Sequence, residues 1–257
     1  MTFHEFGTEN EKTVVLIHPS LVMWDYFEYV VPLMKDHFHL IIPALPGYDK
    51  EQDGDFTSVE RIASELEDWL IDHGHREISC IYGCSMGGAV VARVLADNRV
   101  CARSAVMDGG ITPYRLPWIL TRFIAIRDFL MVSMGKAGGL KLLEKAFSAD
   151  DYSEDDLKYI SDVLKMLSYK TIWRTFESCN NYDMPEPVRS GCSRVEYWFA
   201  RSEMKDRKWD IAYIREQFPQ ARFRRFDRVG HGGLAPLQPE RLVRGLIRVM
   251  ESEEVGA

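Results

Sequence analysis

Short apolar runs alternate with an amphipathic segment over the first 110 residues. Four of these runs are typical of buried strands: Thr13 to Ile17, Phe38 to Ile42, Glu77 to Tyr82 and Arg103 to Met107. Between the second and third runs, Thr57 and Glu60 have the spacing of a capping box, and apolar residues then recur at helical spacing as far as Gly74. Strands that alternate with helices of this length predict βαβ units and a mostly parallel central sheet flanked by helices.

The pattern changes after Gly110. Residues 113 to 187 show only helical patterns, among them the apolar stretch from Leu116 to Met134 and a helix that begins near Ser153. Strand and helix patterns then resume: strand Arg194 to Phe199, helix Trp209 to Phe218, strand Ala221 to Phe226 and helix Gln238 to Met250. We therefore predict an α/β core formed by residues 1–112 and 188–257, interrupted by a helical insertion at residues 113–187.

Charge and composition argue against several classes of function. The 257 residues carry a net charge of −7, which argues against a nucleic-acid partner and gives no attraction to anionic membranes. The five cysteines form no CxxC pair, and no phosphate loop or metal-ligand cluster is visible, so we expect no metal and no cofactor. The N-terminus lacks a signal-peptide pattern, and the Leu116 to Met134 stretch contains Arg122, Arg127 and Asp128. We expect a cytoplasmic protein, with docking of that stretch onto a membrane as an alternative.

The candidate nucleophile is Ser85. The segment Gly83-Cys84-Ser85-Met86-Gly87 fits the pattern G-x-S-x-G and lies between a predicted strand and a predicted helix. A tight strand-to-helix turn makes the serine hydroxyl project, and glycines leave room for that turn. Met86 begins the helix, so its backbone N–H is free to bind an oxyanion on a substrate.

A serine nucleophile needs a base, and His231 is our candidate. It follows the last predicted strand in a glycine-flanked loop, Gly230-His231-Gly232. An acid that orients this imidazole should lie between Ser85 and His231 in the sequence, at the end of a strand. The candidate acids are Glu203, which we favour, Asp108 as the alternative, and then Asp206 or Asp227. The remaining histidines are assigned no chemistry.

These motifs resemble the α/β-hydrolase superfamily, in its serine-nucleophile branch with a helical cap. The resemblance covers nearly the whole chain, and the order serine, acid, histidine is that of the family. His18-Pro19-Ser20 stands where the family carries its His-Gly oxyanion turn, and Pro46-Gly47-Tyr48 matches its Pro-Gly loop. Proline has no N–H, so the resemblance implies that the backbone N–H of Ser20 is the second oxyanion donor, beside that of Met86.

The resemblance implies a serine hydrolase that cleaves a carboxylic ester or related acyl bond through an acyl-enzyme. Its small-molecule acyl substrate is expected to be small and apolar, because aromatic residues are frequent in the insertion. The candidate pocket residues are Trp24, Trp118, Phe123 and Trp173. A thioesterase, a C–C bond hydrolase, a lactonase, an acyltransferase and a non-catalytic ligand-binding protein stay open as alternatives. The oligomeric state is left open between monomer and homodimer.

Three departures from the family separate the chain from its best-known branches. Pro43 replaces the usual Asp before the Pro-Gly loop, Asp49-Lys50 replaces its common end, and the favoured acid is Glu rather than Asp. A serine nucleophile also argues against epoxide hydrolases and haloalkane dehalogenases, which share this fold but use an Asp.

Overall fold

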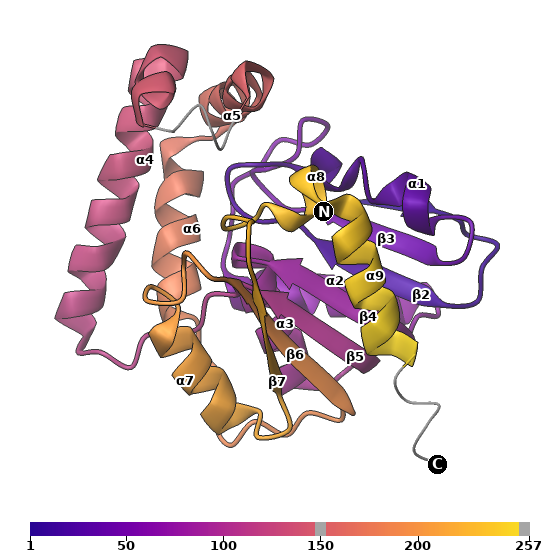
Figure 1. The fold of residues 1–257 in the computed structure, drawn as a ribbon. Helices are drawn as coiled ribbons and strands as arrows, with labels where there is room; N and C mark the ends of the chain where they lie inside the picture. Colours follow the sequence, from indigo (N-terminus) through magenta and orange to yellow (C-terminus); the bar gives the residue numbers. More distant parts are fainter. Residues whose placement is uncertain (147–152, 252–257) are drawn as a thin grey trace.

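A seven-stranded sheet forms the centre of the molecule (Figure 1). The computed structural model describes residues 1–146 and 153–251. The strands are β1 (Thr2–Phe6), β2 (Thr13–Ile17), β3 (His39–Ala44), β4 (Glu77–Cys84), β5 (Cys101–Asp108), β6 (Arg194–Ala200) and β7 (Arg222–Phe226). Their spatial order is β1-β3-β2-β4-β5-β6-β7, with β1 antiparallel to β3 and the other neighbours parallel. The predicted mostly parallel sheet is confirmed.

The central strands are apolar because helices cover both faces of the sheet. All five residues of β2 are buried. Val15 and Ile17 face one apolar cluster, while Val14 and Leu16 face the other, as the two-residue period of a strand requires. The first cluster includes α2 (Val59–Asp72), α3 (Met86–Asp97) and α7 (Lys208–Gln217); the second includes α1 (Val31–Met34), α8 (Leu234–Leu237) and α9 (Pro239–Glu251).

Two local predictions differ from the structure. The edge strand β1 is not among the predicted strands, because its sequence, Thr-Phe-His-Glu-Phe, is neither a continuous apolar run nor a strict alternation, and its pairing with β3 defines it. Helix α2 is capped by Ser58, whose hydroxyl accepts the N–H of Arg61, and not by Thr57. Glu60 instead accepts the N–H of Asp183, so the predicted Thr57–Glu60 capping box is wrong.

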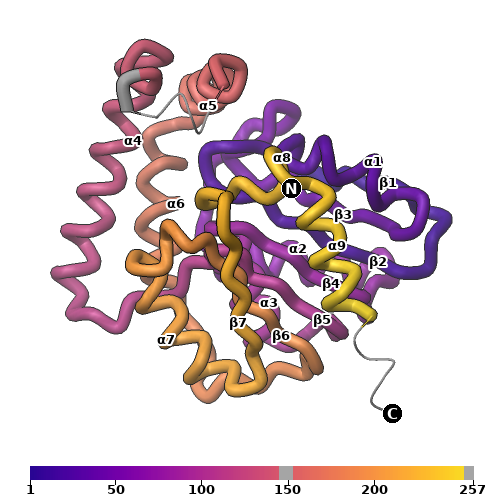
Figure 2. Tube along the Cα trace, in the orientation of Figure 1, coloured from indigo at the N-terminus to yellow at the C-terminus, as the bar shows by residue number. Residues whose placement is uncertain are grey.

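Three helices stand between β5 and β6 in the sequence: α4 (Trp118–Ala146), α5 (Glu154–Met166) and α6 (Tyr169–Asn181). Figures 1 and 2 show them together at one side of the sheet, away from α9. They fit the cap expected from the helical patterns, although the limits 113 and 187 stay predictions. Ser153 caps α5 with a reciprocal capping box to Asp156. Helix α4 is interrupted at Gly139, whose φ is 59°.

Helix α6 is held on the core by its hydroxyl groups. Thr171 Oγ1 accepts the backbone N–H of Phe56 at 3.1 Å, and Ser178 Oγ accepts that of Val59 at 2.8 Å. Thr175 and Tyr48 hydroxyls share a hydrogen bond of 2.9 Å. In the described ranges, no helix has the length and apolar content needed to cross a membrane.

Candidate active site

Ser85 occupies a strained turn between β4 and α3. Its φ of 51° and ψ of −111° lie outside the regions that L-residues favour. A Cβ at Gly83 would lie 2.2 Å from the carbonyl oxygen of Gly87, and one at Gly87 would lie 2.3 Å from that of Ile17. The two glycines of the motif are therefore required by close backbone approach, and the turn holds Ser85 at the carboxyl end of the sheet.

The backbone of Ser85 is tied to the segment that leaves β5. Its N–H donates to the carbonyl of Asp108 at 2.8 Å, and its carbonyl accepts the N–H of Ile111 at 3.3 Å. Only 5% of Ser85 is exposed. The candidate nucleophile thus has a fixed backbone and lies beneath other parts of the chain.

His231 and Glu203 form a close pair. His231 Nδ1 lies 2.5 Å from Glu203 Oε2, although the residues come from different loops, one after β7 and one after β6. The other carboxylate oxygen of Glu203 accepts the backbone N–H of Ala200 at 2.9 Å, and Arg207 Nε lies 3.8 Å from Oε2. Burial acts to raise the pKa of Glu203, but the bond to His231, the charges of His231 and Arg207, and the Ala200 N–H together lower it. Glu203 is therefore an anion that can orient the imidazole.

The end of β5 lies beneath the imidazole of His231. A Cβ at Gly109 would lie 2.8 Å from His231 Cε1 and Nδ1, and Gly109 has a φ of 55°. The hydroxyl of Tyr26 donates to the carbonyl of Gly232 at 2.8 Å and so holds the loop that carries the histidine. No hydrogen bond joins Ser85 and His231 in the part of the chain that the structure describes. Such bonds are often long in unliganded enzymes and shorten when substrate binds.

Asp108, the alternative acid, has a different partner. Its Oδ2 accepts the hydroxyl of Tyr82 at 2.7 Å. Burial raises the pKa of Asp108 to about 6, above the ordinary 3.8. Of the two leading candidate acids, the structure brings Glu203 to His231 and leaves Asp108 with Tyr82. The further candidate Asp227 lies 3.8 Å from Arg201 and from Arg225.

His18 fixes the backbone of the candidate oxyanion turn. It is fully buried, and burial lowers its pKa to about 4, so the ring is neutral at pH 7. The backbone N–H of Leu45 donates to Nε2 at 3.3 Å, which assigns the proton to Nδ1, 2.8 Å from the carbonyl of Pro19. Within the described residues, no hydrogen bond uses the N–H of Ser20 or Met86. The two predicted oxyanion donors follow neighbouring strands, β2 and β4, at one end of the sheet.

Comparison with known families agrees with this topology. A model of the alpha/beta hydrolase family matches residues 14–245. The chain belongs to the alpha/beta hydrolase family.

Solved structures with the alpha/beta hydrolase fold are similar over almost the whole chain. An alpha/beta hydrolase family protein from Desulfitobacterium hafniense has a TM-score of 0.77 at 19% identity, with 97% of this chain and 100% of that chain covered. A carboxylesterase of the thaumarchaeon Nitrososphaera gargenis has a TM-score of 0.76 at 17% identity, with 98% and 95% covered. The epoxide hydrolase CorEH has a TM-score of 0.72 at 15% identity, with 96% and 93% covered. At these identities the similarity establishes the fold, which serves more than one reaction.

The predicted pocket residues of this alpha/beta hydrolase lie in different places. Trp118 and Phe123 are 70% and 64% exposed, so the structure places them on the solvent side of α4 and not in an enclosed pocket. Trp24 stacks on His4 of β1, with ring centres 3.9 Å apart. Trp173 packs edge-on against Phe129, at 5.7 Å, between α6 and α4. None of the four has a described contact with Ser85, so their role in a pocket stays a prediction.

Two residues near the site have no local signal in the sequence. Tyr26 reaches Gly232 across 206 residues of chain, and Arg207 approaches Glu203 within the turns after β6. Tyr159 of α5 accepts the backbone N–H of Met23 at 3.0 Å and donates to Asp25, which fastens the cap to the segment after β2. Only the folded chain brings these groups together.

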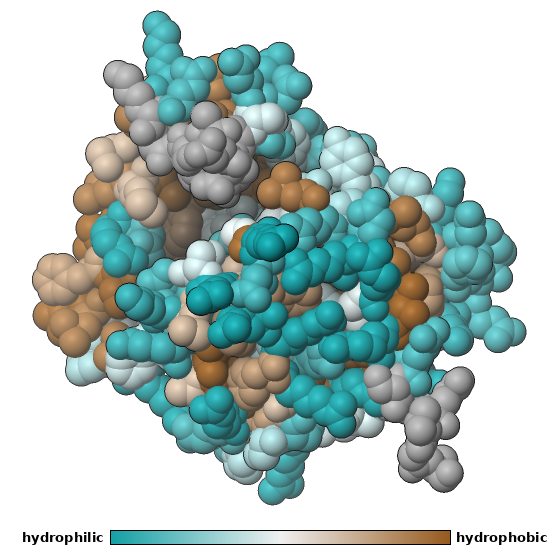
Figure 3. All heavy atoms as spheres, in the orientation of Figure 1, coloured by the Kyte–Doolittle hydropathy of each residue, from teal (hydrophilic) through white to brown (hydrophobic). Residues whose placement is uncertain are grey.

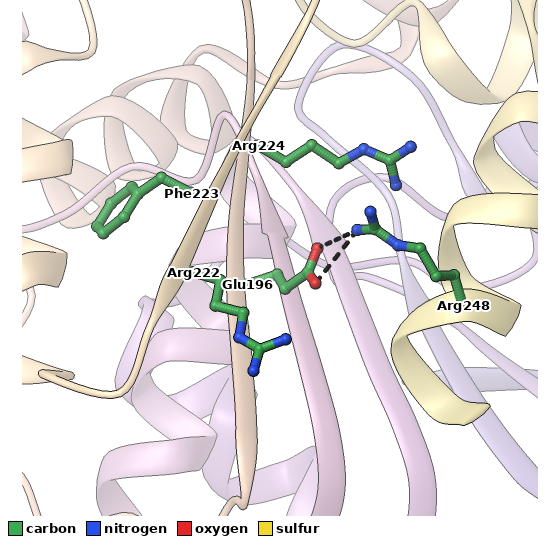
Figure 4. Close-up of a pocket in the computed structure, with 5 residues that line it drawn as sticks. All are labelled: Glu196, Arg222, Phe223, Arg224 and Arg248. Atoms are coloured by element: carbon green, nitrogen blue, oxygen red, sulfur yellow. Dashed lines mark hydrogen bonds and ion pairs between the residues drawn. The ribbon is translucent and has the colours of Figure 1, made fainter. Parts of the chain in front are cut away.

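Two other clusters of polar residues lie away from Ser85. A cavity of about 280 Å³ between β7 and α9 is lined by Glu196, Arg222, Phe223, Arg224 and Arg248 (Figure 4). Glu196 is buried there. Its carboxylate accepts hydrogen bonds from Arg248 at 2.9 Å and from the Trp198 indole N–H at 2.6 Å, and these partners stabilise its negative charge.

The side chains of the second cluster could bind a metal ion. Glu5, His39 and His75 have possible ligand atoms within 4.8 Å of one another, a donor set that zinc accepts. They lie at the amino ends of the parallel strands, opposite Ser85, and Glu5 already pairs with His39 at 2.8 Å. We assign this group no part in the chemistry of the site.

Proposed function

We propose that this alpha/beta hydrolase is a serine hydrolase that cleaves carboxylic esters, with Ser85 as nucleophile, His231 as base and Glu203 as the acid that orients the base. The observation that carries the proposal is the 2.5 Å contact between His231 Nδ1 and Glu203 Oε2 beside the strained serine turn. A nucleophile in such a turn, a histidine and an anionic orienting group are the parts that acyl transfer requires.

The mechanism assigns one step to each group. Ser85 Oγ attacks the carbonyl carbon of the ester while His231 Nε2 takes the hydroxyl proton, and Glu203 stabilises the imidazolium. The backbone N–H groups of Met86 and Ser20 bind the oxyanion. His231 then protonates the departing alcohol, which leaves an acyl group on Ser85. His231 next deprotonates a water molecule, which attacks the acyl carbon. The bond from that carbon to Ser85 Oγ then breaks, His231 returns the proton to Oγ, and the acid is released.

We propose a small, apolar acyl substrate. Ser85 is only 5% exposed, which favours a small substrate, and the cap contributes aromatic side chains such as Trp173 and Phe129. A carboxylesterase among the structural neighbours agrees with this class, whereas the serine at the turn disfavours the epoxide-opening reaction of CorEH. Thioesters and acyl transfer would use the same acyl-enzyme, so substrate panels must separate them.

The first test is covalent labelling with a fluorophosphonate, followed by intact-mass measurement and peptide mapping. We expect one adduct per chain, on Ser85, because only an activated serine attacks this probe quickly. The adduct should disappear in Ser85→Ala and His231→Ala and persist in His37→Ala, a variant of an exposed histidine. A folded protein that takes up no probe would refute the serine mechanism and favour a ligand-binding role.

A panel of p-nitrophenyl esters and matching thioesters then defines the substrate. We expect short acyl chains to react fastest with the wild type and turnover to vanish in Ser85→Ala. Turnover that persists in Ser85→Ala would place the reaction elsewhere.

A further inference from the structure

The outer side of α4 is the most apolar exposed surface among the described residues. Eight large apolar side chains there are between 43% and 70% exposed: Trp118, Ile119, Leu120, Phe123, Ile126, Leu130, Met131 and Met134. Figure 3 shows brown and tan atoms gathered over the side of the molecule where Figure 1 places α4. Together they expose several hundred Å², at or above the roughly 300–600 Å² of the largest patch on a typical monomer.

The same helix also has a buried apolar side. Ala125 and Val132 are buried, and Phe129 packs against Trp173 of α6. Helix α4 therefore has apolar side chains on two opposite sides, with its charged residues mainly between them, a pattern typical of a helix that is covered on both sides. The cap covers one side only, so the other side lacks a partner within the described chain.

The apolar spacing along the outer side is symmetric towards both ends of the helix but not at its centre, where Ile126 is equivalent to Arg127. Ile119, Phe123, Ile126, Leu130 and Met134 follow one another at intervals of four, three, four and four residues, the spacing of helix-packing seams. About a centre between residues 126 and 127, Ile119 is equivalent to Met134 and Phe123 to Leu130. An antiparallel pair of such helices would set large apolar side chains opposite one another at both ends, which is the self-complementarity that a two-fold interface requires.

The charges beside the seam favour a protein partner over an anionic membrane. Arg127 is the one charged residue on the outer side between Ile119 and Met134 in the described helix, and it pairs with Asp128 at 2.6 Å. Arg122, at the edge, pairs with Glu177 at 2.6 Å. With both cations neutralised and a net charge of −7, the surface has no excess positive charge for anionic lipids.

We propose that two copies of this chain form a dimer in which their α4 helices pack antiparallel through the outer sides. Phe123 of one copy then lies against Leu130 of the other, and Ile119 against Met134. The exposed apolar side chains approach the roughly 800 Å² per partner of a standard interface. The inference does not depend on the proposed chemistry of Ser85.

The test is mass measurement by light scattering across a dilution series. The chain has a mass of 29.7 kDa, so a dimer has twice that mass, about 59 kDa. We expect the wild type to reach the dimer mass, and Phe123→Glu to weaken association by about a hundredfold or more, because it buries a charge in the seam. Trp209→Glu, at an aromatic of α7 that is 56% exposed, should stay dimeric. Circular dichroism checks that each variant is folded.

Cross-linking tests the antiparallel register. In a Cys101→Ser background, a mixture of Phe123→Cys and Leu130→Cys proteins should join through a short bismaleimide, while either protein alone should not. In the proposed register, like positions are displaced by seven residues, about 10 Å along the helix. Cross-linking of Phe123→Cys with itself would refute the register. A wild type that stays at 29.7 kDa, or that binds phosphatidylcholine vesicles as a monomer, would refute the dimer.

Discussion

Two buried carboxylates stand at the ends of neighbouring strands, Glu203 just after β6 and Asp108 at the end of β5. They are almost equally buried, with 7% and 6% exposure, so burial alone does not distinguish them. Their pKa values nevertheless move in opposite directions, below the ordinary value for Glu203 and up to about 6 for Asp108. The partners of each carboxylate decide the difference.

Glu203 has partners that favour the anion. The hydrogen bond to His231 and the positive charge of Arg207 stabilise the carboxylate, and the Ala200 N–H supplies a second hydrogen bond. Asp108 has the neutral hydroxyl of Tyr82, which does not offset the loss of solvation. Two acids of similar burial can therefore serve different purposes, one to orient a base and the other to buttress the interior.

The largest effect that we expect from breaking this pair is on turnover. Glu203→Gln should lower kcat for ester hydrolysis by about 10³–10⁴-fold, because the neutral amide no longer stabilises the imidazolium and permits the wrong tautomer. Steady-state kinetics measure the loss. Glu240→Gln, at an exposed carboxylate of α9, is the matched control and should keep wild-type turnover. A loss below about tenfold in Glu203→Gln would mean that His231 is oriented by another group.

A smaller effect, on stability, should come from Asp108→Asn. The folded protein holds a proton on Asp108 up to about pH 6, whereas the unfolded chain releases it near pH 3.8, so this group makes stability fall as pH rises between those values. At about 1.4 kcal/mol per pH unit, the difference corresponds to about 3 kcal/mol at most. Asp108→Asn should match the parent near pH 4 and become more stable above pH 6. Urea unfolding at several pH values tests this.

The same Asp108→Asn variant should keep its kcat/KM within about tenfold of the parent, since His231 retains Glu203. A difference in unfolding free energy that does not change with pH would show that Asp108 is ionised throughout. A large loss of kcat/KM would give Asp108 the role assigned to Glu203.

The smallest expected effects distinguish Tyr26, which holds the loop of His231, from Tyr82, which donates to Asp108. Tyr26→Phe removes the hydrogen bond to the Gly232 carbonyl beside His231. If the activation free energy rises by about 1 kcal/mol because His231 is held less firmly, kcat/KM falls about fivefold. Tyr82→Phe removes the donor to Asp108, so it should lower the free energy of unfolding by about 1–3 kcal/mol and leave kcat/KM nearly unchanged. Kinetics and urea unfolding on both variants give the comparison, and a reversed pattern would contradict it.

The strands of the core could be predicted because each central strand is apolar on both faces. The predicted run Thr13 to Ile17 coincides with β2, where every residue is buried. Strand β1 lacks that pattern and depends on its pairing with β3, so local periodicity could not find it. The same limit applies to α4, since a helix with apolar residues on two opposite sides does not reveal which side faces the core.

Only part of the candidate site could be predicted from the sequence. The glycines around Ser85 are visible because a tight turn demands them, and the structure shows the backbone contacts that require them. Chain order and a position just after a strand favour Glu203 over Asp108, but they leave Asp108 open, because the approach of a carboxylate to His231 depends on how the turns after Ala200 fold back. Trp118 and Phe123 are aromatic residues of the cap, but their exposure could not be predicted from residue type.

The end of β5 contacts both the proposed nucleophile and the proposed base. Asp108 holds the backbone of Ser85, and the next residue, Gly109, lies beneath the ring of His231. A displacement of this backbone would carry both groups with it, whereas rearrangement of α4, α5 or α6 need not alter their separation. In the proposed mechanism, the cap can therefore change its shape while a single strand end keeps the spacing between nucleophile and base.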